Sequence, residues 1–312
     1  MDSPLTHPFP TSPDPRPWEE VLDTFLVEKG NRSGSPRTVD SYGRMLMAFF
    51  GTSAPPLLGV TPADALRFAH GIGASGRPPS AATIAARTAC LSSFFRFLMR
   101  MGLAVANPCD GLDRPRTPPA LARGYTAEEV RALLTVIPCS VKGRRDRAIV
   151  LVLVLTGRRR AEVMGMRAGD IVIEGETAWY TYRGKGGKRG RREMHASALD
   201  ATVTTLSDAG KDLRTMARED SLWQAGATQR GVTSGTFYCR LRGYQEAAGL
   251  PSSGVHVLRH TAAKLRREAG ESVESVSQFL DHSSLAVTTI YLRRLEGQRD
   301  TTCPAVAAAI GL

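Results

Sequence analysis

The sequence predicts a mainly α-helical protein with a small antiparallel sheet, an α+β fold divided into two domains. Apolar residues recur at the spacing of one helical face through most of residues 18–101. Prolines interrupt the chain within residues 107–123, and three short strand-like segments follow between residues 171 and 196. At roughly 100 to 200 residues per domain, a chain of 312 residues is long enough for two.

Four helices are expected in the first domain, which we place at residues 17–106. Thr61 followed by Pro62 is typical of a helix start, because threonine caps the free N–H groups of the first turn and proline fits the first helical position. Gly51 and Gly102 are expected to end the second and fourth helices. The expected helices begin at Trp18 and cover residues 38–50, 62–68 and 81–101.

Proline content marks the expected domain boundaries. Residues 1–16 are rich in proline and are expected to be a flexible tail. Residues 107–123 show neither helical nor strand periodicity, so we interpret them as a linker. The second domain, residues 124–312, opens with a capping box in which Thr126 and Glu129 would satisfy each other's backbone N–H groups.

The second domain is expected to hold a small sheet among helices. Residues 148–155 are apolar throughout, and periodicity alone does not decide between a buried helix and a buried strand. Residues 171–173 and 177–182 are expected to form a hairpin. After a glycine-rich turn, a third strand is expected near residues 193–196, and the remainder is predicted to be helical.

Charge narrows the possible functions. The chain has 41 Lys and Arg against 30 Asp and Glu, a formal net charge of +11, which favours a polyanionic partner such as nucleic acid. Arginines outnumber lysines, and the planar guanidinium suits phosphate contacts, although a GC-rich genome would give the same bias. The five cysteines are widely separated without a CxxC spacing, which argues against a zinc site and a disulfide framework.

No membrane partner is expected. The longest apolar run, residues 148–155, is far shorter than the ~20 residues that cross a bilayer. The first residues lack the basic start and apolar stretch of a secretory signal. We therefore expect a soluble protein of the cytoplasm.

Four separated segments carry side chains that make chemical sense together. Residues 156–162 read TGRRRAE, and residues 184–188 read GKGGK. Residues 256–260 read HVLRH, and residues 280–282 read LDH, with Tyr291 nine residues after His282. Together they supply arginines, histidines, a lysine on a glycine-rich turn and a tyrosine.

These segments resemble, in order, the motifs of the tyrosine recombinase (phage integrase) family, which are TGxRxxE, GKGxK, HxLRH, and LGH followed by a tyrosine. The resemblance extends more weakly to residues 18–105, whose four helices and the following Asn107-Pro108 are similar to the family's core-binding domain. It implies a C-shaped clamp in which a helical domain and a catalytic domain enclose duplex DNA.

The resemblance selects one of three consecutive arginines. The family spacing places the catalytic arginine three residues before the glutamate, which is Arg159 before Glu162. Positions i and i+3 on a helix are neighbours, so the carboxylate can orient the guanidinium. Arg158 and Arg160 are then expected to pack or to contact phosphate.

The chemistry implied by the resemblance is cleavage of DNA without a metal or a cofactor. Such cleavage needs a nucleophile, cations over the non-bridging oxygens and an acid for the leaving 5'-oxygen. Tyr291 would attack phosphorus to form a 3'-phosphotyrosine, and His256 would take its proton, because a phenol with a reference pKa of about 10 is protonated at neutral pH. Lys185 would protonate the leaving 5'-oxygen. The 5'-hydroxyl of another strand could then attack the phosphotyrosine and rejoin the DNA.

The remaining site residues follow from the same resemblance. Arg159, Arg259 and His282 would hold the non-bridging phosphate oxygens, with Glu162, His260 and Asp281 in support. Contacts to the DNA backbone are expected from the basic residues of the glycine-rich turn and the strand after it, which are Arg183, Lys188, Arg189, Arg191 and Arg192.

Asp281 departs from the family motif, which usually has glycine before the histidine. Glycine there would suit a left-handed helix cap, and aspartate tolerates that conformation better than most residues. Alternatively, a carboxylate beside His282 could favour its imidazolium form.

The partners expected from the resemblance are double-stranded DNA with a specific recombination site and further copies of the chain. The apolar segment 304–312 would dock on a neighbouring copy, giving a homotetramer on DNA. The short stretch before Trp18 leaves little room for an extra arm-binding domain, so we expect a Xer-like, plasmid or transposon recombinase, an enzyme of mobile DNA integration.

Two alternatives remain open at this point. A type IB topoisomerase would use the same phosphotyrosine chemistry as a monomer, but the expected exchange segment argues against it. A non-catalytic DNA-binding regulator would not need the complete set of reactive residues.

Overall fold

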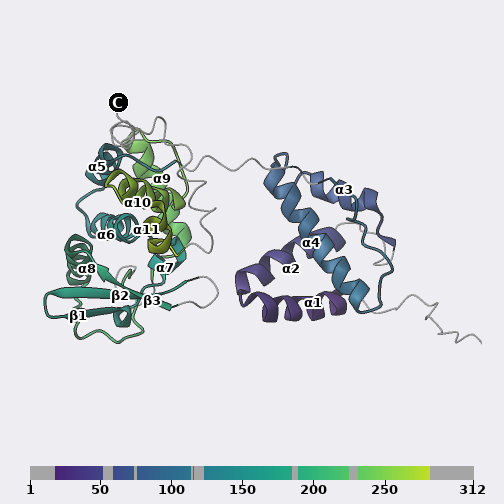
Figure 1. Cartoon of the computed structure of the whole chain (residues 1–312), viewed down its shortest axis with the longest axis horizontal. Coiled ribbons are helices and arrows are strands. Elements are labelled where there is room, and N and C mark those ends of the chain that lie inside the picture. The colour runs from purple at the N-terminus through teal and green to yellow at the C-terminus, as the bar shows by residue number, and fades with distance from the viewer. Residues whose placement is uncertain are drawn as a thin grey trace, which may run out of the picture. The chain divides into compact units, whose positions relative to one another are not determined.

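The computed structural model describes residues 18–51, 59–73, 76–113, 115, 123–184, 189–224 and 231–281. The chain divides into two compact units, Met1–Ala120 and Leu121–Leu312. The described part is mostly helical and contains one three-stranded antiparallel sheet, which confirms the predicted fold class (Figure 1). No helix in the described ranges has the length and apolar character to cross a membrane.

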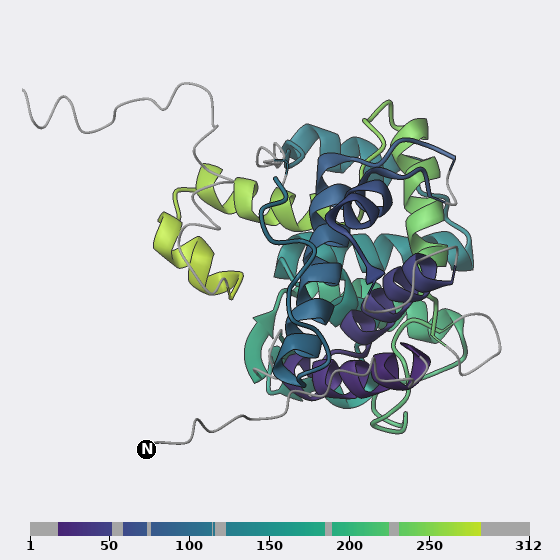
Figure 2. The ribbon, with the colours of Figure 1, turned by 90° about the vertical axis from the view of Figure 1, so that its right-hand side faces the viewer.

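The first unit contains four described helices with α4 along its length, as two views show (Figures 1 and 2). Thr61 and Asp64 form a reciprocal capping box at the start of the third helix, which confirms the start predicted there. Ser35 caps the second helix with proline at its first position, so this helix begins two residues before the predicted Thr38. The helices are α1 (Trp18–Ser33), α2 (Pro36–Phe50), α3 (Pro62–His70) and α4 (Ala81–Arg100).

Aromatic side chains fill the core of the first unit. Phe25 meets Phe94 edge to face with ring centroids 5.2 Å apart, and Phe94 also lies 5.6 Å from Phe50. Phe49 meets Phe68 of α3 at 5.1 Å. Edge-to-face pairs add to the stabilisation that burial of the rings already provides. These contacts join α1, α2, α3 and α4 around one core.

The second unit is built around α6 (Val141–Thr156), which is buried along most of its length. This helix settles the ambiguity of residues 148–155: the segment is helical, with Ile149 and Leu153 buried and Leu151 and Leu155 partly buried. Because even its least buried face carries leucine, this segment has no polar face and its sequence lacks helical periodicity. The other helices are α5 (Ala127–Val136), α7 (Arg160–Met164), α8 (Ala196–Asp208), α9 (Ser234–Ala247), α10 (His256–Glu268) and α11 (Val273–Phe279).

The sheet of the second unit has the order β1-β2-β3. The predicted hairpin is present as β1 (Ile171–Glu174) and β2 (Thr177–Arg183), with Ile171 opposite Tyr180. The third strand was predicted too late in the sequence: β3 is Arg189–Met194, and His195 already caps α8. Its run of arginines hides the strand in the sequence, and pairing with β2 determines it in the fold.

The capping box predicted at the start of the second domain is also present. Thr126 N–H donates to Glu129 Oε2 at 2.8 Å, and Glu129 N–H donates to Thr126 Oγ1 at 3.1 Å. The preceding residue, Tyr125, donates its backbone N–H to Thr261 Oγ1 of α10 at 2.9 Å. The entry of the chain into this unit is therefore fixed against the helix that carries His256 and Arg259.

Candidate active site

The site is built where the turn after α6 meets the end of α11. Gly157 ends α6 with a left-handed φ of +60°, which glycine adopts without strain. A Cβ on Gly157 would lie 2.7 Å from Leu280 Cδ2 and 2.8 Å from Phe279 Cε1. Glycine is therefore required at this position both by the backbone angle and by the close approach of the two segments.

Arg159 follows this turn and is held by Glu162, as the sequence predicts. The Arg159 backbone N–H donates to Glu162 Oε2 at 2.9 Å, and its Nη1 donates to Glu162 Oε1 at 2.9 Å. The glutamate is almost buried, whereas the arginine side chain keeps 30% of its surface exposed. One carboxylate thus orients both the backbone and the guanidinium, and leaves the guanidinium accessible to a ligand.

Arg259 lies deeper, with only 3% of its surface exposed. Its Nη1 donates to the carbonyl of Gly157 at 2.7 Å, and its Nη2 donates to the carbonyl of Leu280 at 2.5 Å. It therefore bridges the α6–α7 turn and the end of α11. The two arginines differ in burial and contacts: Arg159 is partly exposed, whereas Arg259 is buried and bonded to two backbone carbonyls.

His256 is the first residue of α10, one helical turn before His260. Burial lowers the pKa of His256 below its ordinary value, and the positive charges of Arg259, Arg159 and Arg160 lower it further. The imidazole is therefore neutral at neutral pH and able to accept a proton. His260 meets it edge to face, with ring centroids 4.8 Å apart.

Asp281 has a left-handed φ of +51°, the conformation expected for the position of the family's glycine. Its carboxylate accepts hydrogen bonds from Arg158 and Arg192. Burial acts to raise the pKa of Asp281, but hydrogen bonds from Tyr182 and Arg158 and the other arginine contacts outweigh burial and lower it. The carboxylate is therefore ionised and engaged with two guanidinium groups.

The arginines of β3 do not share one face. Alternation along the strand leaves Arg189 and Arg191 exposed and turns Arg192 toward α11. Arg191 forms an ion pair with Glu174 at 2.7 Å and lies 4.7 Å from the Trp179 ring centroid. Arg183, the last residue of β2, lies opposite Arg189, the first residue of β3. The basic surface expected for the DNA backbone is thus carried by Arg183 and Arg189, while Arg191 and Arg192 have acidic partners within the chain.

Of the two expectations for Arg158, packing or phosphate contact, the structure favours packing, since its side chain is only 1% exposed; its ion pair with Asp281 was not predicted. The only feature of the sequence that pointed to this ion pair was the aspartate at position 281, where the family motif has glycine. Four predicted site residues lie outside the described residues, as does the predicted exchange segment 304–312; they are Lys185, Lys188, His282 and Tyr291. Within the described ranges, no three His, Cys, Asp or Glu side chains are grouped to hold a metal ion.

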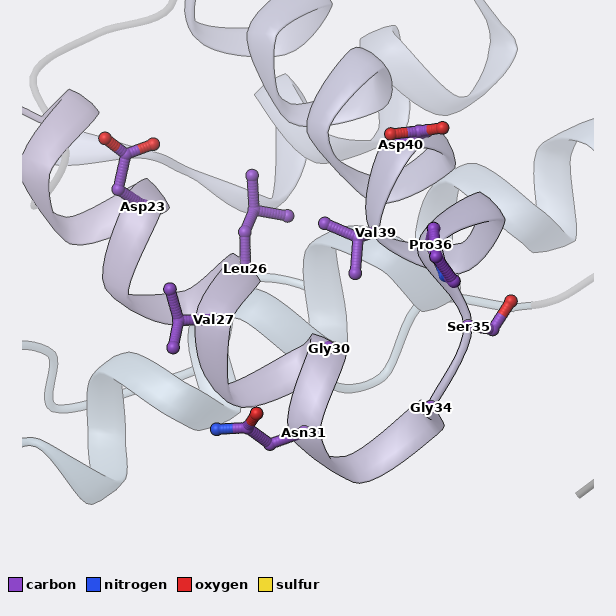
Figure 3. Close-up of a pocket in the computed structure, with 10 residues that line it drawn as sticks. All are labelled: Asp23, Leu26, Val27, Gly30, Asn31, Gly34, Ser35, Pro36, Val39 and Asp40. Atoms are coloured by element: carbon purple, nitrogen blue, oxygen red, sulfur yellow. The ribbon is translucent and has the colours of Figure 1, made fainter. Parts of the chain in front are cut away.

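A surface hollow lies in the first unit, away from these residues in the sequence. It is lined by Leu26 and Val27 of α1 and Val39 of α2, with Asp23 and Asp40 at its edge. Figure 3 shows Leu26 and Val39 between the two helices. None of the predicted catalytic residues lines this hollow.

Comparison with known families identifies the chain. Residues 124–297 match the model of the phage integrase family, and residues 25–102 match the N-terminal SAM-like domain of phage integrases. The chain belongs to the phage integrase family. The first match alone spans more than half of the chain and includes every segment from which the resemblance was inferred.

Relatives and solved structures of this family agree with the match. Tyrosine recombinase XerC of Herpetosiphon aurantiacus is 31% identical over 67% of this chain and 68% of that protein. Tyrosine recombinase XerA of Pyrococcus furiosus is 29% identical over 88% of this chain and 89% of that protein. A lambda integrase dimer bound to a COC' core site has a TM-score of 0.67 at 20% identity, covering 90% of this chain and 79% of that chain. XerH bound to a palindromic difH substrate has a TM-score of 0.64 at 20% identity, covering 93% of this chain and 83% of that chain.

Proposed function

We propose that this chain is a site-specific recombinase that cuts and rejoins DNA through a 3'-phosphotyrosine at Tyr291. The observation that carries the proposal is the convergence of Arg159, His256 and Arg259, which come from segments about a hundred residues apart, at one turn. A cluster of two guanidinium groups around a neutral imidazole is suited to a phosphodiester, because it supplies positive charge and a base together.

The proposed cleavage is a transfer of the phosphoryl group from a 5'-oxygen to a phenol. His256 accepts the phenolic proton while the Tyr291 oxygen bonds to phosphorus, and the bond from phosphorus to the 5'-oxygen breaks. Lys185 gives its proton to that 5'-oxygen. Rejoining is the reverse, with a 5'-hydroxyl of another strand as the attacking group. Neither a metal ion nor a cofactor takes part in these steps.

The two arginines have different proposed tasks at the phosphate. Arg159, exposed and held by Glu162, forms hydrogen bonds to a non-bridging oxygen. Arg259 contributes positive charge beneath the phosphate and fixes the two backbone segments around it. His282 completes this set.

Duplex DNA is the proposed substrate, and the net charge of +11 supports it. Arg183, Lys188 and Arg189 are proposed to contact the backbone, with smaller parts for Arg191 and Arg192. We place the DNA-binding helical domain at residues 17–106, the linker at 107–123 and the catalytic domain at 124–312. A lambda integrase tetramer bound to a Holliday junction, with a TM-score of 0.66, supports the proposal of a tetramer. We further propose that residues 304–312 dock on a neighbouring copy in this tetramer.

The proposal is tested by trapping the covalent intermediate. DNA linked to the protein is recovered from cells and sequenced, and a nicked duplex of the recovered site is incubated with the purified chain. We expect a DNA adduct that forms in excess EDTA and maps to Tyr291 by mass spectrometry. The variant Tyr291→Phe should bind the duplex with parental affinity and form no adduct. An adduct in that variant, or a requirement for a divalent cation, would contradict the proposal.

A second readout on the same protein separates recombination from relaxation. Two duplexes carrying the recovered site should exchange strands and yield recombinant products. Relaxation of supercoiled plasmid without strand exchange would instead identify a topoisomerase.

A further inference from the structure

Three arginines from three elements bind consecutive carbonyls at the end of α11. Arg192 of β3 donates to the carbonyl of Gln278 at 2.8 Å, Arg158 donates to that of Phe279, and Arg259 of α10 donates to that of Leu280 at 2.5 Å. The last carbonyls of a helix have no partner within the helix and carry partial negative charge. These arginines, which we call the three-arginine cap, satisfy them.

Aromatic rings hold the guanidinium groups of the cap in place. The Arg158 guanidinium carbon lies 4.2 Å from the centroid of the Tyr182 ring and 5.6 Å from that of Phe279. Arg192 lies 5.5 Å from the Phe279 ring, and its Nε donates to Tyr182 Oη at 3.3 Å. Cation–π contacts of this kind are strongest where water is excluded. The cap is therefore an ordered cluster rather than a set of surface side chains.

Arg158 is a buried member of this cap whose counter-ion is Asp281. Its side chain is only 1% exposed, and a buried charge without an opposite charge is strongly unfavourable. Asp281 forms an ion pair with it and a second ion pair with Arg192 at 3.1 Å. Glycine, the residue of the family motif at this position, would adopt the same left-handed φ but would leave Arg158 without this carboxylate.

The cap joins the elements that carry the proposed catalytic groups. Arg158 precedes Arg159 on the α6–α7 turn, Arg259 belongs to the helix that begins with His256, and Asp281 precedes His282 in the sequence. A shift of the α11 end would therefore move the turn that positions Arg159. A displacement of about 1 Å in a catalytic side chain is enough to slow an enzyme strongly.

We propose that Asp281 is a positioning residue for the cleavage reaction, acting through its ion pairs with Arg158 and Arg192, and that Arg158 and Asp281 form a matched pair in this chain. The effect on cleavage rests on the proposed function. The coupling between the two residues is a property of the free protein and is measurable without DNA.

The free protein is tested first, with the variants Arg158→Met, Asp281→Gly and the combination of both. Asp281→Gly keeps the left-handed backbone but removes the counter-ion, so it should lower the melting temperature by several degrees. Adding Arg158→Met should recover part of that loss, because methionine fills similar space without a charge. Losses that simply add in the combined variant would overturn the matched pair.

Cleavage is then measured at saturating nicked DNA of the recovered site, where the rate reports chemistry rather than affinity. Asp281→Gly and Asp281→Asn should each form adduct about tenfold more slowly, with dissociation constants within about threefold of the parent. Asparagine retains the shape and the tolerance of a left-handed φ, so it tests the charge alone. A parental rate in either variant would overturn the positioning role.

Asp208→Asn is the matched control for stability. Asp208 forms a bidentate ion pair with Arg144 near the start of α6, at the opposite end of that helix from the α6–α7 turn. Its loss should lower the melting temperature but leave the rate of adduct formation unchanged. An equal fall in rate in Asp208→Asn would show that Asp281 acts only through stability.

Absence of adduct in the parent protein would contradict the proposed function. The coupling between Arg158 and Asp281 is decided separately, by the melting temperatures of the free protein.

Discussion

The cores of the two units differ in what they bury. Among the described residues, the buried polar side chains of the first unit are the uncharged Thr88, Ser92 and Asn107, set in a core of stacked and edge-on aromatic rings. The second unit also buries charged side chains, which are Arg145, Asp146, Arg158 and Arg259. Burial of apolar rings stabilises a fold directly, whereas burial of charge is favourable only when partners compensate it.

The buried charges of the second unit are themselves of two kinds. Asp146 is compensated by a bidentate bond from Arg240 at 2.6 and 2.8 Å and by the Tyr244 hydroxyl at 2.9 Å. Arg259 donates to the backbone carbonyls of Gly157 and Leu280 and lies close enough to His256 to lower the pKa of that imidazole. Buried charge alone therefore does not identify a site. The candidate site is distinguished by the convergence of Arg259 and Arg159 beside His256.

The largest effect is expected at Arg159 and Arg259, the two arginines with proposed roles at the phosphate. Arg259→Ala should slow adduct formation by about 10³-fold and also destabilise the second unit, because two buried carbonyls lose their donor at about 1–3 kcal/mol each. Arg159→Ala should slow adduct formation by a similar factor with a smaller loss of stability, since the Arg159 side chain is partly exposed and Glu162 keeps its bond from the residue 159 backbone N–H. Single-turnover kinetics and urea unfolding check both. Equal stability losses in the two variants would remove the distinction between them.

The next effect tests the aromatic core. Phe94→Ala should lower the free energy of unfolding of the first unit by about 3–5 kcal/mol, because Phe94 is fully buried and contacts the rings of Phe25, Phe50 and Phe95. The unfolding transition of the second unit should not move. Hydrogen exchange resolved by peptide measures the two units separately. Faster exchange in α6 would show that the second unit depends on the first for its stability.

The smallest effect concerns the pH dependence of cleavage. A general base works in its neutral form, so the lowered pKa of His256 should keep cleavage active below pH 6.5, the reference value of the imidazole. Arg160→Gln removes one of the charges that lower this pKa, so the acidic limb of the pH-rate profile should move to higher pH by a few tenths of a unit. Arg131→Gln, on the exposed side of α5, is the control. A limb that moves to lower pH would contradict the assignment.

The same shift affects stability. Because the folded His256 has the lower pKa, the unfolded chain binds the extra proton as pH falls below about 6.5. Stability from this group is therefore complete above that pH and is lost as pH falls through the folded pKa. Arg160→Gln should reduce this loss, which acid unfolding measured from pH 7 to pH 5 can detect.

Local signals in the sequence predicted much of the fold. Thr61 and Thr126 marked helix starts because capping depends on neighbouring residues only. The pair Arg159–Glu162 was expected from the spacing of the family motif; the structure places Arg159 at the N-cap of α7 rather than within the helix, and Glu162 in its first turn. The third strand was misplaced because its pairing with β2 is not encoded in its own apolar pattern.

Long-range pairs were beyond a single sequence. Arg158 and Asp281 are separated by 123 positions, and no residue near either of them indicates that the two side chains pair. The departure from glycine at Asp281 was visible, but its partner emerged only when the fold brought the α6–α7 turn against α11. The bonds of Arg259 to two carbonyls were equally hidden, because backbone atoms leave no mark in a sequence.

The central claim is that Arg159, His256 and Arg259 surround one phosphate of DNA. The most direct test is a crystal structure of Tyr291→Phe bound to a nicked duplex of the recovered site. The account predicts that a guanidinium nitrogen of Arg159 lies within about 3 Å of a non-bridging oxygen of the phosphate beside the nick, with the side chains of Arg259 and His256 next to the same phosphate. A phosphate bound elsewhere on the chain, with these side chains facing away from it, would contradict the account.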